Sequence, residues 1–91
     1  DLVFNLQTLQ VTRAGTSIRL NPTCLAILKE LMAKSPAVVS RLRLETVVWN
    51  GSPPDSDSLR ANLYLLRRAV DKPFDKALIK THPGMGWSLG E

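Results

Sequence analysis

The sequence predicts an α+β domain in which short strands come first, three helices follow and a β-hairpin ends the chain. Three observations support this prediction. Apolar residues alternate with a period of two over residues 2–20, recur at helical spacing over residues 22–70, and form two short runs around a glycine-rich turn over residues 78–89. Residues 1–91 are expected to form one domain, because a chain of about 100 residues usually folds as one.

The N-terminal strands are predicted from alternation. Leu2, Phe4 and Leu6 fall on one face, and residues 9–12 and 17–20 continue the same pattern with a glycine-containing turn between them. Successive side chains of a strand point to opposite faces, so this pattern is typical of a half-buried sheet. We therefore expect a small antiparallel meander.

The first helix carries its own boundary signals. Asn21 is suited to accept from the free N–H groups of the first turn, and Pro22 fits the first helical position. Pro36 disfavours helix at Ser35, so the helix should end there. The single cysteine, Cys24, lies on the apolar face of this helix, where we expect a small buried hydrophobe. A zinc site is excluded because the chain has one cysteine and one histidine.

The second helix should begin after Ser40, whose hydroxyl is a good N-terminal cap. Leu44, Val47 and Val48 are expected to supply its buried face. The segment 50–54 contains glycine and two prolines, cannot continue a helix and predicts a loop.

The third helix is expected to start after the acidic segment 55–57 and to run to about Val70. At about 100° per residue, one narrow apolar stripe must face the core. That stripe contains Leu59, Leu63, Leu66 and Val70. The remaining surface carries Ser58, Arg60, Ala61, Asn62, Tyr64, Leu65, Arg67 and Arg68. Arginine bridges phosphates or reads guanine, asparagine reads adenine, and leucine contacts the thymine methyl group, so this surface suits DNA.

The end of the chain predicts a hairpin. Residues 78–81 and 87–89 form its strands, and residues 82–86 form a turn with two glycines. Three helices followed by a hairpin is the order of a winged helix, in which the third helix lies in the DNA major groove. Lys80, Thr81 and His82 of the wing are further expected DNA contacts.

The charge balance is moderately basic, which fits a nucleic-acid partner but does not require one. Twelve Lys and Arg against eight Asp and Glu give a net charge of +4. No apolar run reaches the length of a membrane span. Paired carboxylates, metal-ligand clusters and phosphate loops are not found, so we predict neither an enzyme nor a cofactor. The chain begins with Asp1 without a signal peptide, and we expect a piece of a longer cytoplasmic protein.

Several segments resemble the OmpR/PhoB family of response-regulator output domains. They are Leu20-Asn21-Pro22-Thr23 followed by Leu28, Val39-Ser40-Arg41, Val48-Trp49-Asn50, Leu63 to Ala69, and Ile79 to Trp87. The segments follow the order of the family pattern along nearly the whole chain. The resemblance implies a winged helix-turn-helix with a four-stranded N-terminal antiparallel sheet, three helices and a C-terminal hairpin wing.

The resemblance also implies partners. An N-terminal receiver domain, absent from these residues, would dimerise on phosphorylation and place two output domains on tandem DNA half-sites about one helical turn apart. Arg41 would meet a phosphate beside the N-terminus of the second helix. The loop between the second and third helices would contact RNA polymerase. That loop comprises Asn50, Gly51, Ser52, Pro53 and Pro54.

The sequence departs from the family pattern on the expected DNA face. Tyr64 and Leu65 stand where the family often has basic residues, Arg60 stands where it often has an acidic one, and Pro83 replaces the wing arginine. Fewer cations release fewer counterions and give a shallower salt dependence. Tyr64, Leu65 and Pro83 motivate a second hypothesis, a winged helix whose exposed face binds RNA polymerase or a partner regulator.

The two tryptophans leave two interpretations open. Trp49 ends an apolar helix face, and Trp87 occupies a family aromatic position beneath the wing. Either could stack on a nucleotide base, but the core interpretation is favoured for both.

Overall fold

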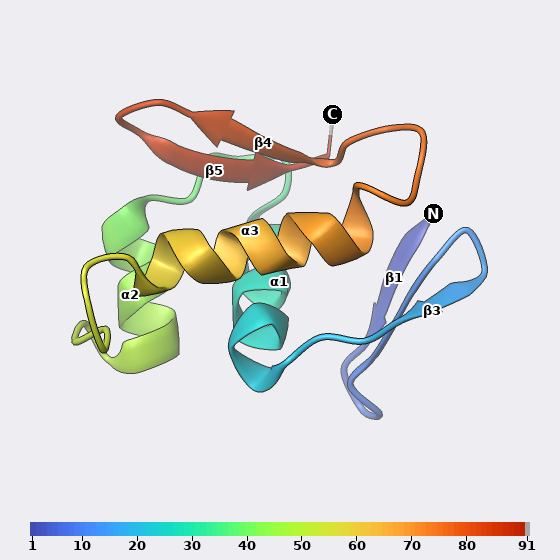
Figure 1. Cartoon of the computed structure of the whole chain (residues 1–91), viewed down its shortest axis with the longest axis horizontal. Coiled ribbons are helices and arrows are strands. Elements are labelled where there is room, and N and C mark those ends of the chain that lie inside the picture. The colour runs from blue at the N-terminus through green and yellow to red at the C-terminus, as the bar shows by residue number, and fades with distance from the viewer. Residues whose placement is uncertain (91) are drawn as a thin grey trace.

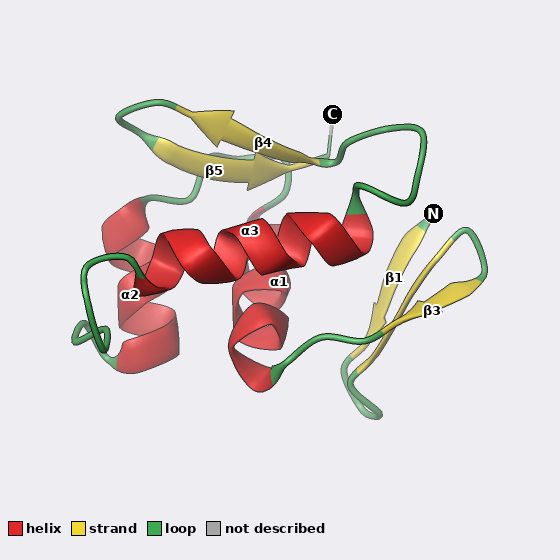
Figure 2. Ribbon diagram, viewed as in Figure 1, coloured by secondary structure: helices red, strands yellow, loops and turns green. Residues whose placement is uncertain are grey.

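The computed structural model describes residues 1–90 as a sheet, three helices and a hairpin (Figures 1 and 2). The strands before the helices are β1 (Leu2–Asn5), β2 (Gln10–Arg13) and β3 (Thr16–Ile18). The helices are α1 (Pro22–Lys34), α2 (Arg41–Trp49) and α3 (Ser58–Val70). The hairpin consists of β4 (Ile79–His82) and β5 (Gly86–Leu89). In Figure 1 the hairpin lies along one side of α3, and the N-terminal sheet lies beside the C-terminal end of that helix.

Within residues 1–90, the N-terminal sheet has three antiparallel strands in the order β1-β2-β3. The prediction of a four-stranded sheet is therefore wrong for this part of the chain. The stretch between β1 and β2 forms turns instead. The side-chain oxygen of Asn5 accepts from the N–H groups of Gln7 and Thr8, at 2.9 and 3.1 Å, and Leu9 has a φ of 60°. Leu6 is therefore exposed, against the expectation that it joins the inward face.

The helix boundaries agree with the capping signals. The side-chain oxygen of Asn21 accepts from the N–H of Cys24 at 2.7 Å, and Ser40 accepts from the N–H of Arg43 at 3.0 Å. The acidic segment before α3 acts differently, because Asp57 occupies the N-cap position without a side-chain bond to the helix. Asp55 instead accepts from the N–H of Asp57 and folds the turn that precedes the helix.

The core lies between the three helices and the hairpin. The predicted stripe of α3 is confirmed, because its four apolar residues are all buried. Leu44 supplies the buried face of α2, whereas Val47 is exposed and was wrongly assigned to it. Trp49 and Trp87 both pack against the core, which confirms the core interpretation of the two side chains. Cys24 is also buried, and burial raises the pKa of its thiol above the ordinary 9.0.

The wing is joined to the segment before α2. Val39 and Trp87 exchange two backbone hydrogen bonds, of 2.7 and 3.0 Å, so β5 has β4 on one side and Val39 on the other. Gly86 makes this approach possible, because a Cβ there would lie 2.0 Å from the carbonyl oxygen of Val39. The wing and α2 are consequently held in one fixed arrangement.

A buried arginine connects the N-terminal sheet to the end of α3. Arg13 of β2 is 2% exposed and donates to the carbonyl oxygen of Val70 at 2.5 Å, to the carboxylate of Asp71 at 3.2 Å and to the carbonyl of Lys76. Its guanidinium also lies 4.8 Å from the centre of the Phe74 ring. These contacts fix the sheet against the α3–β4 connection.

No helix within the described residues is both long enough and apolar enough to cross a lipid bilayer.

Candidate nucleic-acid interface

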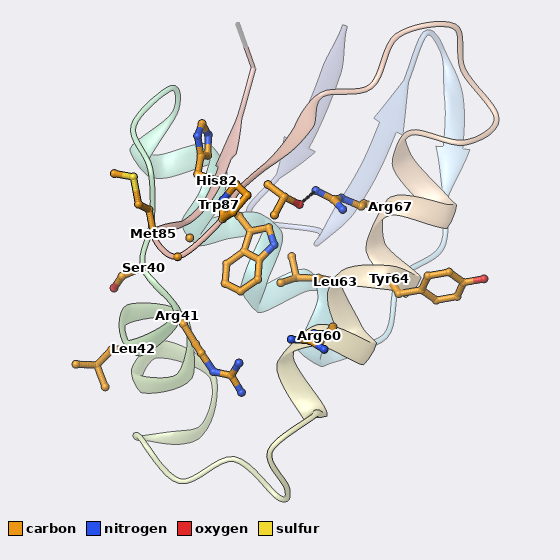
Figure 3. A pocket seen from close by; sticks show the side chains of 14 residues that line it. Ser40, Arg41, Leu42, Arg60, Leu63, Tyr64, Arg67, His82, Met85 and Trp87 are labelled. Carbon is orange, nitrogen blue, oxygen red and sulfur yellow. Dashed lines mark hydrogen bonds between the residues drawn. The ribbon is translucent and has the colours of Figure 1, made fainter.

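A groove of about 750 Å³ separates the wing from α3 and the start of α2 (Figure 3). Three arginines line it, Arg41 from α2 and Arg60 and Arg67 from α3, and none of the carboxylates of residues 1–90 does. Figure 3 shows the Trp87 indole projecting from the wing toward Leu63 and closing the bottom of the groove. The walls are therefore cationic and the floor is apolar.

The cations of α3 are not neutralised by carboxylates in the described structure. The ion pairs among residues 1–90 involve Arg13, Arg41 and Arg43. The arginines of α3 are in none of them. Exposed charge that no carboxylate pairs with is available to an anionic partner.

Arg67 joins α3 to the wing. Its guanidinium donates to the hydroxyl of Thr81 in β4, and the Nε atom is buried without a partner among the described residues. The side chain is half-buried, so it combines a structural link with exposure of part of its guanidinium to the groove. Arg67 and Thr81 were both expected to contact DNA, and the structure brings these two residues together.

Arg41 organises the segment that leads into α3. Its Nε lies 3.0 Å from a carboxylate oxygen of Glu45, and its terminal nitrogen donates to the carbonyl of Ser56 at 2.6 Å. The guanidinium still lines the groove at the N-terminus of α2. Arg41 is thus positioned beside a helix N-terminus, which favours anions, but two of its donors are already bonded.

The predicted contacts at the start of α3 lie in two different environments. Arg60 and Ala61 are exposed, whereas Ser58 and Asn62 are half-buried. The amide nitrogen of Asn62 donates to the carbonyl of Ser58 at 2.9 Å, and its oxygen lies 3.8 Å from the sulfur of Cys24. The amide of Asn62 therefore faces α1 and its own helix rather than the groove.

Tyr64, Leu65 and Arg68 lie on the outer side of α3. Tyr64 is 60% exposed, and Figure 3 shows its ring pointing away from the groove floor. The Arg68 guanidinium lies 6.0 Å from the centre of that ring, at the limit of a cation–π contact. Leu65 is exposed beside them. The outer side of α3 therefore presents one cationic side chain beside two large, mainly apolar ones.

The wing residues divide between the two faces of the hairpin. Thr81 faces α3, whereas His82 bonds to the hydroxyl of Ser88 at 2.7 Å and points away from the groove centre in Figure 3. Lys80 is exposed on β4. At the turn, Pro83 and Met85 are exposed, so the tip of the wing is apolar.

Comparison with known proteins identifies the family. Residues 15–89 match the family described as "Transcriptional regulatory protein, C terminal". The chain belongs to this family. It is a winged-helix output domain of the OmpR/PhoB response regulators, a family of transcription-factor domains rather than enzymes. Two expectations of the sequence are thereby confirmed, the family and its role in controlling transcription.

Individual relatives agree with this assignment. The regulatory domain is 34% identical over 91 residues to the transcriptional regulatory protein AfsQ1 of Streptomyces coelicolor. The alignment covers 98% of this chain and 40% of that protein. It also resembles the response regulator DrrB of Thermotoga maritima, described as an OmpR/PhoB homologue, with 26% identity and a TM-score of 0.85 over 100% of this chain and 42% of that one. The domain thus spans about two fifths of these proteins.

A solved complex with DNA shares the fold of this regulatory domain. The DNA-binding domain of RstA from Klebsiella pneumoniae, in complex with the RstA box, has a TM-score of 0.83 and 22% identity. The alignment covers 98% of this chain and 90% of that one. The likeness shows a common winged-helix scaffold.

Sequence reasoning missed several groove residues of the regulatory domain, three of them at its rim. Ser40 and Leu42 line the groove from the start of α2, and Met85 lines it from the turn of the wing. Leu42 had no local signal, because an exposed leucine in a first helical turn looks like any surface residue. The sequence did indicate that Met85 lies in a turn, but not that this turn faces α2.

Proposed function

We propose that this domain binds a specific double-stranded DNA sequence, with α3 in the major groove and the wing at the minor groove. The observation that carries the proposal is the groove between α2, α3 and the wing, which has arginine walls and no lining carboxylate within the described part of the chain. α3 is long enough to fill a major groove, and its exposed surface carries arginines without ion pairs in the described residues.

The contacts divide into those that position the domain and those that read bases. Arg41, Arg67 and Thr81 surround the space between α3 and the wing, where a phosphate backbone would pass. Arg60, Tyr64 and Leu65 lie on the exposed surface of α3, which would face base edges. The remaining proposed contacts are Ser58, Ala61, Asn62, Arg68, Lys80 and His82. Asn62 reads a base only if its amide leaves the carbonyl of Ser58.

The wider assembly is part of the same proposal. A receiver domain would precede the chain, and its phosphorylation would bring two copies to tandem half-sites in the cytoplasm. The loop 50–54, which is exposed except at the half-buried Pro53, would offer a surface to RNA polymerase. Asn50 and Gly51 there have positive φ angles of 58° and 88°, which give the loop a defined turn after α2.

Fluorescence anisotropy tests the DNA proposal. A labelled duplex recovered by selection from a random-sequence pool is compared with a scrambled duplex of the same composition. We expect tighter binding to the selected duplex, and we expect Arg68→Ala to weaken binding to both and to reduce the salt slope by about 0.9. Lys29→Ala removes an exposed charge on α1 and serves as the matched control. Equal affinity of the wild-type domain for both duplexes would contradict the proposal.

A second candidate function is protein binding through the outer surface of α3. It is favoured by Tyr64 and Leu65, which expose apolar area where a cation-rich surface would suit DNA better. Heparin chromatography separates the two functions, because retention that falls steeply with salt requires a polyanion-binding surface. Weak retention together with co-purification of a polymerase subunit, lost in Tyr64→Ser, would favour the protein partner.

A further inference from the structure

The turn of the wing presents an apolar tip beside the arginine-lined groove. Met85 in this turn is 66% exposed, and Leu42 in the first turn of α2 is 71% exposed. Both line the groove, and Figure 3 places them on the same rim, across from Arg60 and Tyr64 of α3. A partner that fits this groove must therefore carry negative charge for the arginines and apolar surface for the rim.

The tip is held in place before any partner binds. The N–H of Met85 donates to the carbonyl of His82 at 2.9 Å, which closes the turn. Behind it, Trp87 is bonded to Val39 and Gly86 lies against the same backbone. A side chain on a fixed turn loses less conformational freedom on binding than one on a mobile loop.

We propose that Met85 enters the minor groove of the bound DNA and contacts the deoxyribose walls, a proposal that rests on the DNA-binding function proposed above. Methionine and proline are residue types that proteins place in minor grooves as apolar wedges, and the flexible thioether adapts to irregular surfaces. Pro83 lies exposed in the same turn. The duplex supplies both the charge and the apolar surface that the groove requires.

This contact changes what the wing reads. Arginine in a minor groove favours A-tracts, because their narrow groove concentrates negative potential. Met85 is uncharged and gains nothing from that potential. The contact that Met85 makes is therefore indifferent to A-tracts, and the affinity that this side chain contributes does not decrease with salt.

Two substitutions at one position test the proposal. Met85→Ala should weaken binding to the selected duplex about fivefold at every salt concentration, because apolar burial is lost without a change in charge. Met85→Arg should steepen the salt slope by about 0.9 and create a preference for an A-tract at the wing contact. Leu6→Ala is the matched control, because Leu6 is 60% exposed in a turn away from the groove and should not affect binding.

The outcomes separate this inference from the function on which it rests. If Met85→Ala binds like the wild type at all salt concentrations while Arg68→Ala weakens binding, the DNA function stands and the role of Met85 is refuted. A wild-type preference for an A-tract at the wing contact that Met85→Ala leaves unchanged would also refute it. If the wild type does not discriminate between selected and scrambled duplexes, the DNA function itself fails. Circular dichroism of each variant confirms that affinity is compared between folded proteins.

Discussion

Replacing Arg13 by methionine removes a buried cation from the junction between the N-terminal sheet and the end of α3. The substitution leaves the carboxylate of Asp71, which is 8% exposed, without its cation, and it leaves the carbonyls of Val70 and Lys76 without the donor from Arg13. Removing one partner of a buried ion pair costs about 3–5 kcal/mol. A domain of this size has a free energy of unfolding of about 5–14 kcal/mol, so the variant should lose a large part of its stability.

Urea denaturation followed by circular dichroism measures this loss. Arg19→Met is the matched control, because Arg19 is an exposed arginine and its loss should change the free energy of unfolding by less than about 0.5 kcal/mol. A double-mutant cycle with Asp71→Asn isolates the coupling between the two side chains. A loss below about 1 kcal/mol in Arg13→Met would refute the idea that this connection stabilises the fold.

Three further predictions concern the wing and the core. Gly86→Ala should cost more than about 2 kcal/mol in a thermal unfolding experiment, because its Cβ would collide with the carbonyl of Val39, 2.0 Å away, at a φ of 143°. Thr81→Val removes the acceptor for Arg67 and should lower the free energy of unfolding by about 0.5–1 kcal/mol in urea denaturation. Burial raises the pKa of the Cys24 thiol, so its stabilising contribution is complete below the ordinary pKa of 9.0 and is lost as pH rises through the folded-state pKa. The stability difference between wild type and Cys24→Ala should therefore shrink at alkaline pH.

Each of these predictions has a control and a contradicting result. Gly84→Ala is the control for Gly86, because a Cβ at Gly84 meets nothing within 4 Å, and equal losses would contradict the collision. Thr81→Ser keeps the hydroxyl and should retain the stability that Thr81→Val loses. A constant difference between wild type and Cys24→Ala from neutral to alkaline pH would show that burial does not hold the proton on the thiol.

The helices could be predicted from sequence because their signals are local. The stripe of α3 follows from the helical period alone, and Asn21 and Ser40 cap the helices at the predicted positions. Between β1 and β2, the apolar residues Leu6 and Leu9 imitate a strand, while the Asn5 side chain bonds the following N–H groups and turns the chain. The path of the chain there is determined by these local hydrogen bonds and not by the hydrophobic pattern.

The tertiary connections could not be predicted from sequence. Arg13 and Asp71 are 58 residues apart, and nothing near Arg13 in the sequence distinguishes it from an exposed strand arginine. The candidate site shows the same limit. The helical wheel placed Asn62 on a flank of α3, but only the packing of α1 against that flank shows that its amide is directed inward. Periodicity assigns a face to a residue, while neighbours far along the chain decide what that face meets.

The arrangement of strands around β5 also bears on self-association. A sheet edge with unpaired N–H and C=O groups is a template for another chain. Val39 covers one side of β5, and β4 covers the other, so β4 is the outer strand of the wing. The carboxylate of Asp71 accepts from the N–H of Ile79 at 3.1 Å and occupies the first donor of that strand, and Lys80 places a charge beside it. Only a short segment of β4 is left open, so the wing offers another chain few backbone groups for intermolecular strand pairing.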